Sequence, residues 1–189
     1  MGHYAHVFPL TSNRLSNFDR LRVDPDQTSF WEGREFRTYQ ELNIPALGSL
    51  VIRATVPSDT VLNALSLSLD GGWVRMATAV GGTPAGSFAT PVPIFAANNM
   101  SPSPNRRHDY AGTTFVNLVE LVSGGSHTGG LELDVLRCKC AGNTQQSSSV
   151  GTDSFDQRGI AAGVYYFRFT NLGNDTVTGT WHARYEVRG

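Results

Sequence analysis

The residues with the clearest metal-binding chemistry are two cysteines, Cys138 and Cys140, one position apart. Residues i and i+2 of a strand face the same side, so the two thiols could form half of a soft-metal site. His127 could add a ligand if the segment that holds it pairs with the cysteine strand. Two buried thiols are the simpler interpretation, and a disulfide across one intervening residue would close a very small, strained ring. We therefore predict free, reduced thiols, with no metal and no other cofactor.

Patterns typical of catalysis are weak in this chain. Ser126 and His127 are adjacent in a glycine-rich stretch, and neighbours on an extended chain usually point apart. The G-x-S-x-G motif of a nucleophile elbow does not occur. Asp153 and Asp156 are a candidate carboxylate pair, but turn formation explains them more simply. We therefore expect a protein that is not an enzyme.

Two further groups could bind a ligand. Residues 106–109, Arg-Arg-His-Asp, are the only compact basic cluster, and could hold a phosphate or a carboxylate. An exposed loop or an ion pair between subunits is the simpler interpretation of this cluster. The three tryptophans, Trp31, Trp73 and Trp181, could stack on sugars, although a tryptophan that faces inward on a strand belongs to a core.

Composition limits the classes of partner. Only 16% of the 189 residues are charged, and the formal net charge is −1. Broad nucleic-acid binding needs a basic face, so we expect no nucleic-acid partner. No polybasic patch and no apolar stretch of roughly 20 residues is present, so we expect no membrane insertion. The first ten residues lack the pattern of a signal peptide.

Alternation of apolar and polar residues predicts strands along most of the chain. The expected strands cover residues 36–42, 50–56, 61–69, 73–80, 115–122, 131–138, 164–170 and 176–187. With about eight strands, abundant turn residues and no convincing long helix, the predicted fold is all-β: an antiparallel β-sandwich of jelly-roll type. The sandwich is expected to span residues 36–189.

Several local features follow from the same pattern. Asp70, Gly71 and Gly72 predict the turn of a hairpin, and residues 123–130 predict a loop between two strands. Residues 81–110 contain five prolines and predict an excursion or an edge segment. Residues 145–149 predict a solvated loop. In the last strand, the expected inward residues are Val177, Trp181, Ala183, Tyr185 and Val187, and the expected outward ones are Thr178, Thr180, His182, Arg184 and Glu186.

Residues 1–35 form a separate unit in this interpretation, an extended N-terminal arm. The arm lacks strand alternation, yet it contains large apolar side chains that gain free energy when they are buried. Arginines among them could make forked contacts to a partner. The predicted docking residues are Leu15, Phe18, Arg20, Leu21, Arg22, Phe30 and Trp31.

Three stretches resemble structural proteins of tailed-bacteriophage particles. Residues 17–23, NFDRLRV, resemble a short F-G-R-L-R-V opening of many virion proteins, with Asp19 in place of the glycine. Residues 81–93, GGTPAGSFATPVP, resemble a G-G-T-x-x-G-x-F-x-T-P-x-P segment. The third stretch is discontinuous: SGGSHTGG at 123–130, DQRG at 156–159 and GVYYFRFTNLG at 163–173. The resemblance implies a virion component and no catalytic residue.

The sequence thus favours a non-enzymatic subunit of the virion, assembled in the host cytoplasm and docked through its arm to the tail or the tail fibres. The expected partners are other virion proteins of the tail, fibre or capsid. Because virion parts work through large, persistent contacts, we expect either a homo-oligomer, most plausibly a trimer, or a chain that is monomeric only until it meets the particle. Two alternatives stay open: a capsid decoration protein that braces capsomers, and a receptor- or glycan-binding module. A groove lined by exposed tryptophan or tyrosine would favour the latter.

Overall fold

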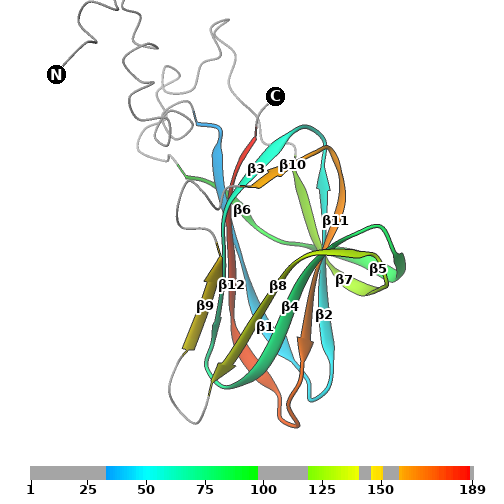
Figure 1. The fold of residues 1–189 in the computed structure, drawn as a ribbon, viewed down its shortest axis with the longest axis vertical. Helices are drawn as coiled ribbons and strands as arrows, with labels where there is room; N and C mark the ends of the chain where they lie inside the picture. The colour runs from blue at the N-terminus through cyan, green and yellow to red at the C-terminus, as the bar shows by residue number, and fades with distance from the viewer. Residues whose placement is uncertain (1–32, 98–118, 141–145, 151–157, 188–189) are drawn as a thin grey trace, which may run out of the picture.

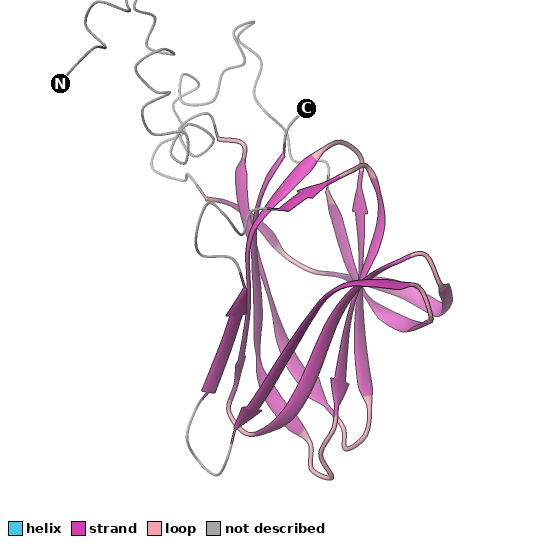
Figure 2. Ribbon diagram, viewed as in Figure 1, coloured by secondary structure: helices cyan, strands magenta, loops and turns pink. Residues whose placement is uncertain are grey.

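A computed structural model describes residues 33–97, 119–140, 146–150 and 158–187. These residues form strands, turns and loops only, with no helix (Figure 2). The described part of the chain accordingly has no helix of the length and apolarity needed to cross a membrane. The all-β prediction is confirmed.

Two antiparallel sheets pack face to face (Figure 1). The first sheet has the order β10-β3-β12-β1-β6, with β9 also paired to β3, and the second has the order β5-β7-β2-β11-β4-β8. The strands of the first sheet are β1 (Glu35–Ile44), β3 (Thr60–Leu69), β6 (Ile94–Ala96), β9 (Gln146–Val150), β10 (Arg158–Ile160) and β12 (Val177–Val187). Those of the second are β2 (Ser49–Val56), β4 (Gly72–Val80), β5 (Thr83–Pro91), β7 (Glu120–Thr128), β8 (Leu131–Cys140) and β11 (Gly163–Asn171).

The pairing order identifies the sandwich as a jelly roll. The first strand pairs with the last, β1 with β12, and the second pairs with the last but one, β2 with β11. Next, β3 pairs with both β9 and β10, and β4 pairs with β8. The chain is therefore one long antiparallel ribbon that is wrapped into two sheets, which is the jelly-roll arrangement.

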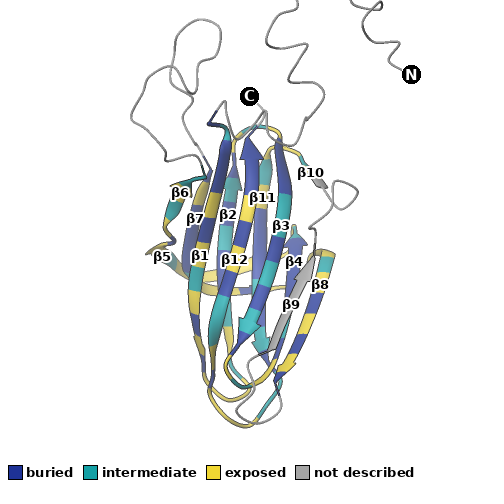
Figure 3. Cartoon of the chain, turned by 90° about the vertical axis from the view of Figure 1, so that its left-hand side faces the viewer, coloured by how far each residue is buried: buried dark blue, intermediate teal, exposed yellow. Residues whose placement is uncertain are grey.

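Period-two alternation places the core between the sheets. Leu65, Leu67 and Leu69 of β3 are buried, and Trp181 and Phe169 are completely enclosed. Dark and light bands alternate along the strands in Figure 3, because successive side chains face opposite sides of the sheet. All five residues expected to face inward on the last strand are buried, so that prediction is confirmed.

A corner of four glycines bends the ribbon beyond β4 and β8. Gly81 and Gly82 join β4 to β5, while Gly129 and Gly130 join β7 to β8, and all four have φ between 69° and 84°. Because Val80 pairs with Leu131 on one side of the corner and Thr83 with Thr128 on the other, the two strands turn together. The β5–β7 pair, the lateral ribbon, projects sideways from the sandwich (Figure 1).

The hairpin expected at residues 70–72 and the loop expected at residues 123–130 to join two paired strands do not form, and the reason is the same for both. The turn at 70–72 leads from β3 in one sheet to β4 in the other, and β7 and β8 lie in one sheet without pairing. Residues 123–128, expected in a loop, are the second half of β7. In a wrapped ribbon, each strand pairs with a strand remote in sequence, which local turn signals do not reveal. The proline-rich stretch does contain an edge strand, β5, as predicted.

Three smaller predictions also need correction. Residues 146–149, expected in a solvated loop, lie in β9 and pair with β3. Glu186, expected to face solvent, is 5% exposed. Glu35, assigned to the arm, is the first residue of β1 and is buried. The sandwich therefore begins before residue 36.

Candidate functional site

The predicted docking arm lies outside the described residues. This applies to Leu15, Phe18, Arg20, Leu21, Arg22, Phe30 and Trp31, and their docking role stays a prediction. Residues 106–109, Asp153 and Asp156 are also outside the described ranges. The candidate site is therefore built from the sandwich and its lateral ribbon.

The two cysteines and His127 are far apart along the β4–β8 ladder. Cys138 pairs with Val74, near the start of β4, whereas the Nε2 atom of His127 lies 2.7 Å from the carbonyl oxygen of Gly81, just past the end of β4. A shared metal site for these three residues does not form. Neither cysteine forms a disulfide, and both are buried in the core, on the same face of β8. Among the described residues, no cluster of three potential ligands occurs.

Burial makes both thiols slow to react. Desolvation raises the pKa of Cys138, and the neighbouring Cys140 raises it further, so the reactive thiolate is disfavoured in the folded state. We expect Ellman's reagent at pH 8 to modify neither thiol within minutes in the native protein and both after unfolding in urea. Fast reaction of the native protein, or stoichiometric zinc by elemental analysis, would contradict this.

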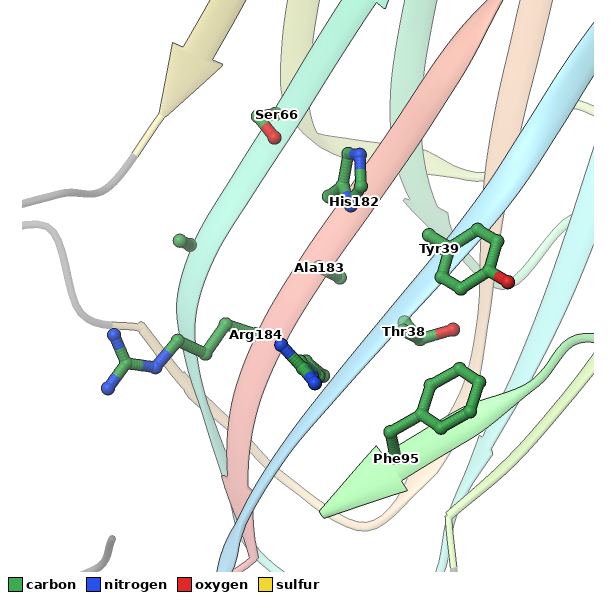
Figure 4. Close-up of a pocket in the computed structure, with 9 residues that line it drawn as sticks. Thr38, Tyr39, Ser66, Phe95, His182, Ala183 and Arg184 are labelled. Carbon is green, nitrogen blue, oxygen red and sulfur yellow. The ribbon is translucent and has the colours of Figure 1, made fainter. Parts of the chain in front are cut away.

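A groove crosses the outer face of the first sheet (Figure 4). Its volume is about 420 Å³, and small side chains on β3, Ala64 and Ser66, form its shallow floor beside larger ones on β12, β1 and β6. The lining residues are Arg37, Thr38, Tyr39, Ala64, Ser66, Phe95, His182, Ala183 and Arg184. Because β1, β3 and β12 are adjacent, alternation brings one side chain in two from each strand to the same face.

Aromatic rings form one side of the groove. The rings of Tyr39 and Phe95 are parallel within 3°, with centroids 5.8 Å apart, and the two residues are 41% and 43% exposed. The ring of His182 lies 6.1 Å from that of Tyr39. In Figure 4, His182 lies between Ser66 and Tyr39, and Arg184 extends across β3 away from the rings. We call Tyr39, Phe95 and His182 the aromatic end of the groove, and Arg37 and Arg184 its cationic end; the two adjoin where Arg37 pairs directly with Phe95.

The cationic end contains two arginines in directly paired positions, Arg37 of β1 and Arg184 of β12. Glu35 lies two residues before Arg37 on β1. Its carboxylate accepts a hydrogen bond of 2.5 Å from Nε of Arg184 and one of 3.2 Å from the side-chain amide of Asn63. Arg37 makes no ion pair within the part of the chain that the structure describes. Like charges directly opposite each other destabilise a sheet. The Arg37 charge is thus the less compensated of the two.

Ser66 and His182 also occupy directly paired positions, on β3 and β12. Serine hydrolysis requires a hydrogen bond between nucleophile and base and a third group that orients the base. Neither a Ser66–His182 hydrogen bond nor an acidic partner for His182 occurs among the described residues. Ser126 and His127 also lack the arrangement that serine hydrolysis requires, because Ser126 is exposed and His127 is buried. The arrangement therefore suits binding better than acyl transfer.

The lateral ribbon forms a second surface, over the outer face of the other sheet. The His127 ring stacks on Tyr166 of β11, with centroids 3.9 Å apart, and Nε2–H donates to the Gly81 carbonyl. Phe88 of β5 meets Tyr166 edge to face, and the Arg53 guanidinium lies 5.4 Å from the Phe88 ring centroid. These contacts hold the ribbon against β2 and β11. Residues 81–93, 123–130 and 163–173 thus meet in one substructure.

An ion-pair network of Glu132, Arg75 and Arg168 stabilises the glycine corner. Glu132 of β8 accepts hydrogen bonds from Arg75 and Arg168, and Arg168 also donates to the carbonyl of Gly129. Its hydrogen bond to Arg75 is the main reason that the pKa of Glu132 lies below its ordinary value. Because the group is largely exposed, its effect on the free energy of unfolding is small.

Of the three tryptophans, Trp181 belongs to the core, as its inward position predicts. Trp73 is 37% exposed and lies under the ammonium group of Lys139, 5.5 Å away, so it is not an inward residue.

The residues of the groove were not singled out as a site from the sequence. Outward positions of His182 and Arg184 were predicted correctly, but their proximity to Tyr39 depends on the β1–β12 pairing. An aromatic residue at the outward position of an alternating strand is the signal that could have found Tyr39.

No protein-family profile matches the chain, and no curated protein sequence matches it. Among solved structures, it is compared with the crystal structure of the infectious bursal disease virus VP2 subviral particle, at 12% identity and a TM-score of 0.09. The alignment covers 84% of this chain and 40% of that one. A TM-score this low supports no inference about fold or function.

Proposed function

We propose that this chain is a non-enzymatic structural subunit of a tailed-bacteriophage particle, docked through its N-terminal arm to the tail or the tail fibres. The observation that supports it best is the convergence of residues 81–93, 123–130 and 163–173, which belong to the second and third stretches that resemble virion proteins. Two of them form the two strands of the lateral ribbon, and the third, β11, supplies the Tyr166 ring beneath it. Parts of two stretches that are separated in the sequence thus meet at one structural element.

The fold is compatible with this role, because jelly rolls occur in viral capsid proteins and in lectins. Fold alone does not assign function, and a capsid decoration protein would be built in the same way. The glycan-binding alternative has a specific observation in its favour, the aromatic groove on the first sheet. A subunit of the particle could also contain such a groove, so the two roles are compatible.

Self-association belongs to the same proposal. Leu131, Leu133 and Val135, on the edge strand β8, are between 44% and 66% exposed. An exposed apolar edge is unfavourable for an isolated monomer and is normally covered in an assembly. A homo-oligomer, most plausibly a trimer, fits this surface, and light scattering coupled to size-exclusion chromatography measures it.

Mass spectrometry of purified particles tests the proposed function. Particles banded on a density gradient should contain peptides of this chain at a constant ratio to the major capsid protein across the band. A ratio that falls to zero after a second gradient would show that the chain is not part of the virion.

A further inference from the structure

We propose that the groove on the outer face of the first sheet binds a saccharide that bears a carboxylate, such as a uronic or sialic acid. The aromatic end of the groove suits the sugar ring. A pyranose ring has an apolar C–H face that stacks on aromatic rings, and Tyr39 and Phe95 present parallel faces that are about two-fifths exposed. Tyrosine also offers a hydroxyl at the wet edge of such a contact.

The cationic end suits the carboxylate. Arg37 and Arg184 lie side by side on paired strands, and Glu35 neutralises only one of them among the described contacts. An anion bound beside Arg37 would offset the Arg37 charge, which no ion pair among the described residues compensates. Arginine binds carboxylates through two parallel hydrogen bonds, so it contributes orientation as well as charge.

The size of the groove favours a small ligand over a protein. Its volume, about 420 Å³, is within the usual range of small-molecule sites. A standard protein interface uses roughly 20–30 residues from each side, with charged residues depleted at its centre. Nine residues line this groove, and arginines occupy one end of it.

Nucleotides share part of this chemistry, because bases stack on aromatic rings and phosphates bind arginine. The surroundings favour the sugar. Glu41 follows Tyr39 on the exposed face of β1. A carboxylate beside the aromatic end accepts hydrogen bonds from the several hydroxyls of a sugar, whereas a nucleotide base stacked there offers fewer donors.

The decisive probes are methyl glucuronide and methyl glucoside, which differ by a carboxylate in place of a hydroxymethyl group. Calorimetry and saturation-transfer NMR on the full chain should show binding of the glucuronide, or of methyl galacturonide, methyl mannuronide or N-acetylneuraminic acid in a matched panel. The acidic sugar should bind about tenfold more tightly than its neutral counterpart, which corresponds to about 1.4 kcal/mol. The substitution Arg37→Gln should remove that preference, and Tyr39→Ala should abolish binding of both sugars.

Matched controls come from the other sheet. Trp73→Ala removes an equally exposed aromatic residue, and Arg137→Gln removes an exposed arginine of β8, so neither should change binding. Thermal melting verifies that each variant is folded. Equal affinity for acidic and neutral sugars, an unchanged preference in the folded Arg37→Gln variant, or no binding of any acidic sugar in the panel would overturn the proposal. Stronger binding of adenosine monophosphate than of every sugar would also overturn it. None of these outcomes affects the chain's presence in particles, so the two proposals fail separately.

Discussion

Deletion of residues 1–32 is expected to leave a folded jelly roll that no longer enters the particle. The sandwich holds its own first strand without the arm. Glu35 begins β1, its carbonyl accepts a hydrogen bond from Ala97, and the carbonyl of Arg34 accepts one from Val187. The arm contributes large apolar side chains that each gain roughly 1.5–3 kcal/mol on full burial against a partner. Loss of even one such contact lowers incorporation by about tenfold.

The position of the cut decides how the result is interpreted. Deletion of residues 1–35 also removes the Glu35 carboxylate, to which Arg184 and Asn63 donate hydrogen bonds. That longer deletion should lower the free energy of unfolding by about 1–3 kcal/mol, while the shorter one changes it little. The measurement combines thermal melting with incorporation into virions grown without the full-length chain. Phe18→Ala and Trp31→Ala should reproduce the defect, and Ser12→Ala, on the same arm, should not. Normal incorporation of the shortened chain would refute the docking role.

Substitution of Gly82 by alanine should release the lateral ribbon from the sandwich. A Cβ atom at Gly82 would lie 2.6 Å from the carbonyl oxygen of Thr128 and 2.9 Å from the amide nitrogen of Gly130. Both contacts are with backbone, so neither can be relieved by a side-chain rotation. The φ angle of +84° adds a conformational cost of roughly 1–2 kcal/mol. We expect the free energy of unfolding to fall by about 3 kcal/mol or more in total.

Gly81 provides the matched control. Its φ angle is +70°, but no atom lies within 4 Å of the position of its Cβ. Gly81→Ala should therefore cost only the conformational part, roughly 1–2 kcal/mol. Urea unfolding measures both variants, and hydrogen exchange should rise in β5 and in the second half of β7 for Gly82→Ala alone. Equal effects of the two substitutions would contradict the close packing at the corner.

The fold class was predictable because β3 and β12 alternate so regularly. Leu65, Leu67 and Leu69 face inward on one, and Trp181, Ala183 and Tyr185 on the other. Such alternation identifies a strand and its buried face without reference to other strands. Alternation does not show which strands pair with one another, so the hairpin expected around Asp70–Gly72 was wrong. Instead of pairing with β3, β4 pairs with β8, about 60 residues further along the chain.

The groove was harder to predict, because its residues come from four strands. Tyr39, Phe95 and His182 meet only through the pairing of β1 with β6 and with β12. Glu186 illustrates a second limit: its outward position was predicted, but its burial depends on neighbours such as Arg34, 4.0 Å away. Alternation thus fixes the face on which a side chain lies, and long-range pairing decides what it contacts.

The decisive measurement for the proposed function is a cryo-electron microscopy reconstruction of particles produced by cells that express this chain. We expect a two-sheet jelly roll at the tail or its fibres, with residues 1–32 ordered against a neighbouring virion protein and the lateral ribbon beside β2 and β11. A reconstruction in which the chain is absent, or is attached through the sandwich while residues 1–32 contact no other protein, would contradict it.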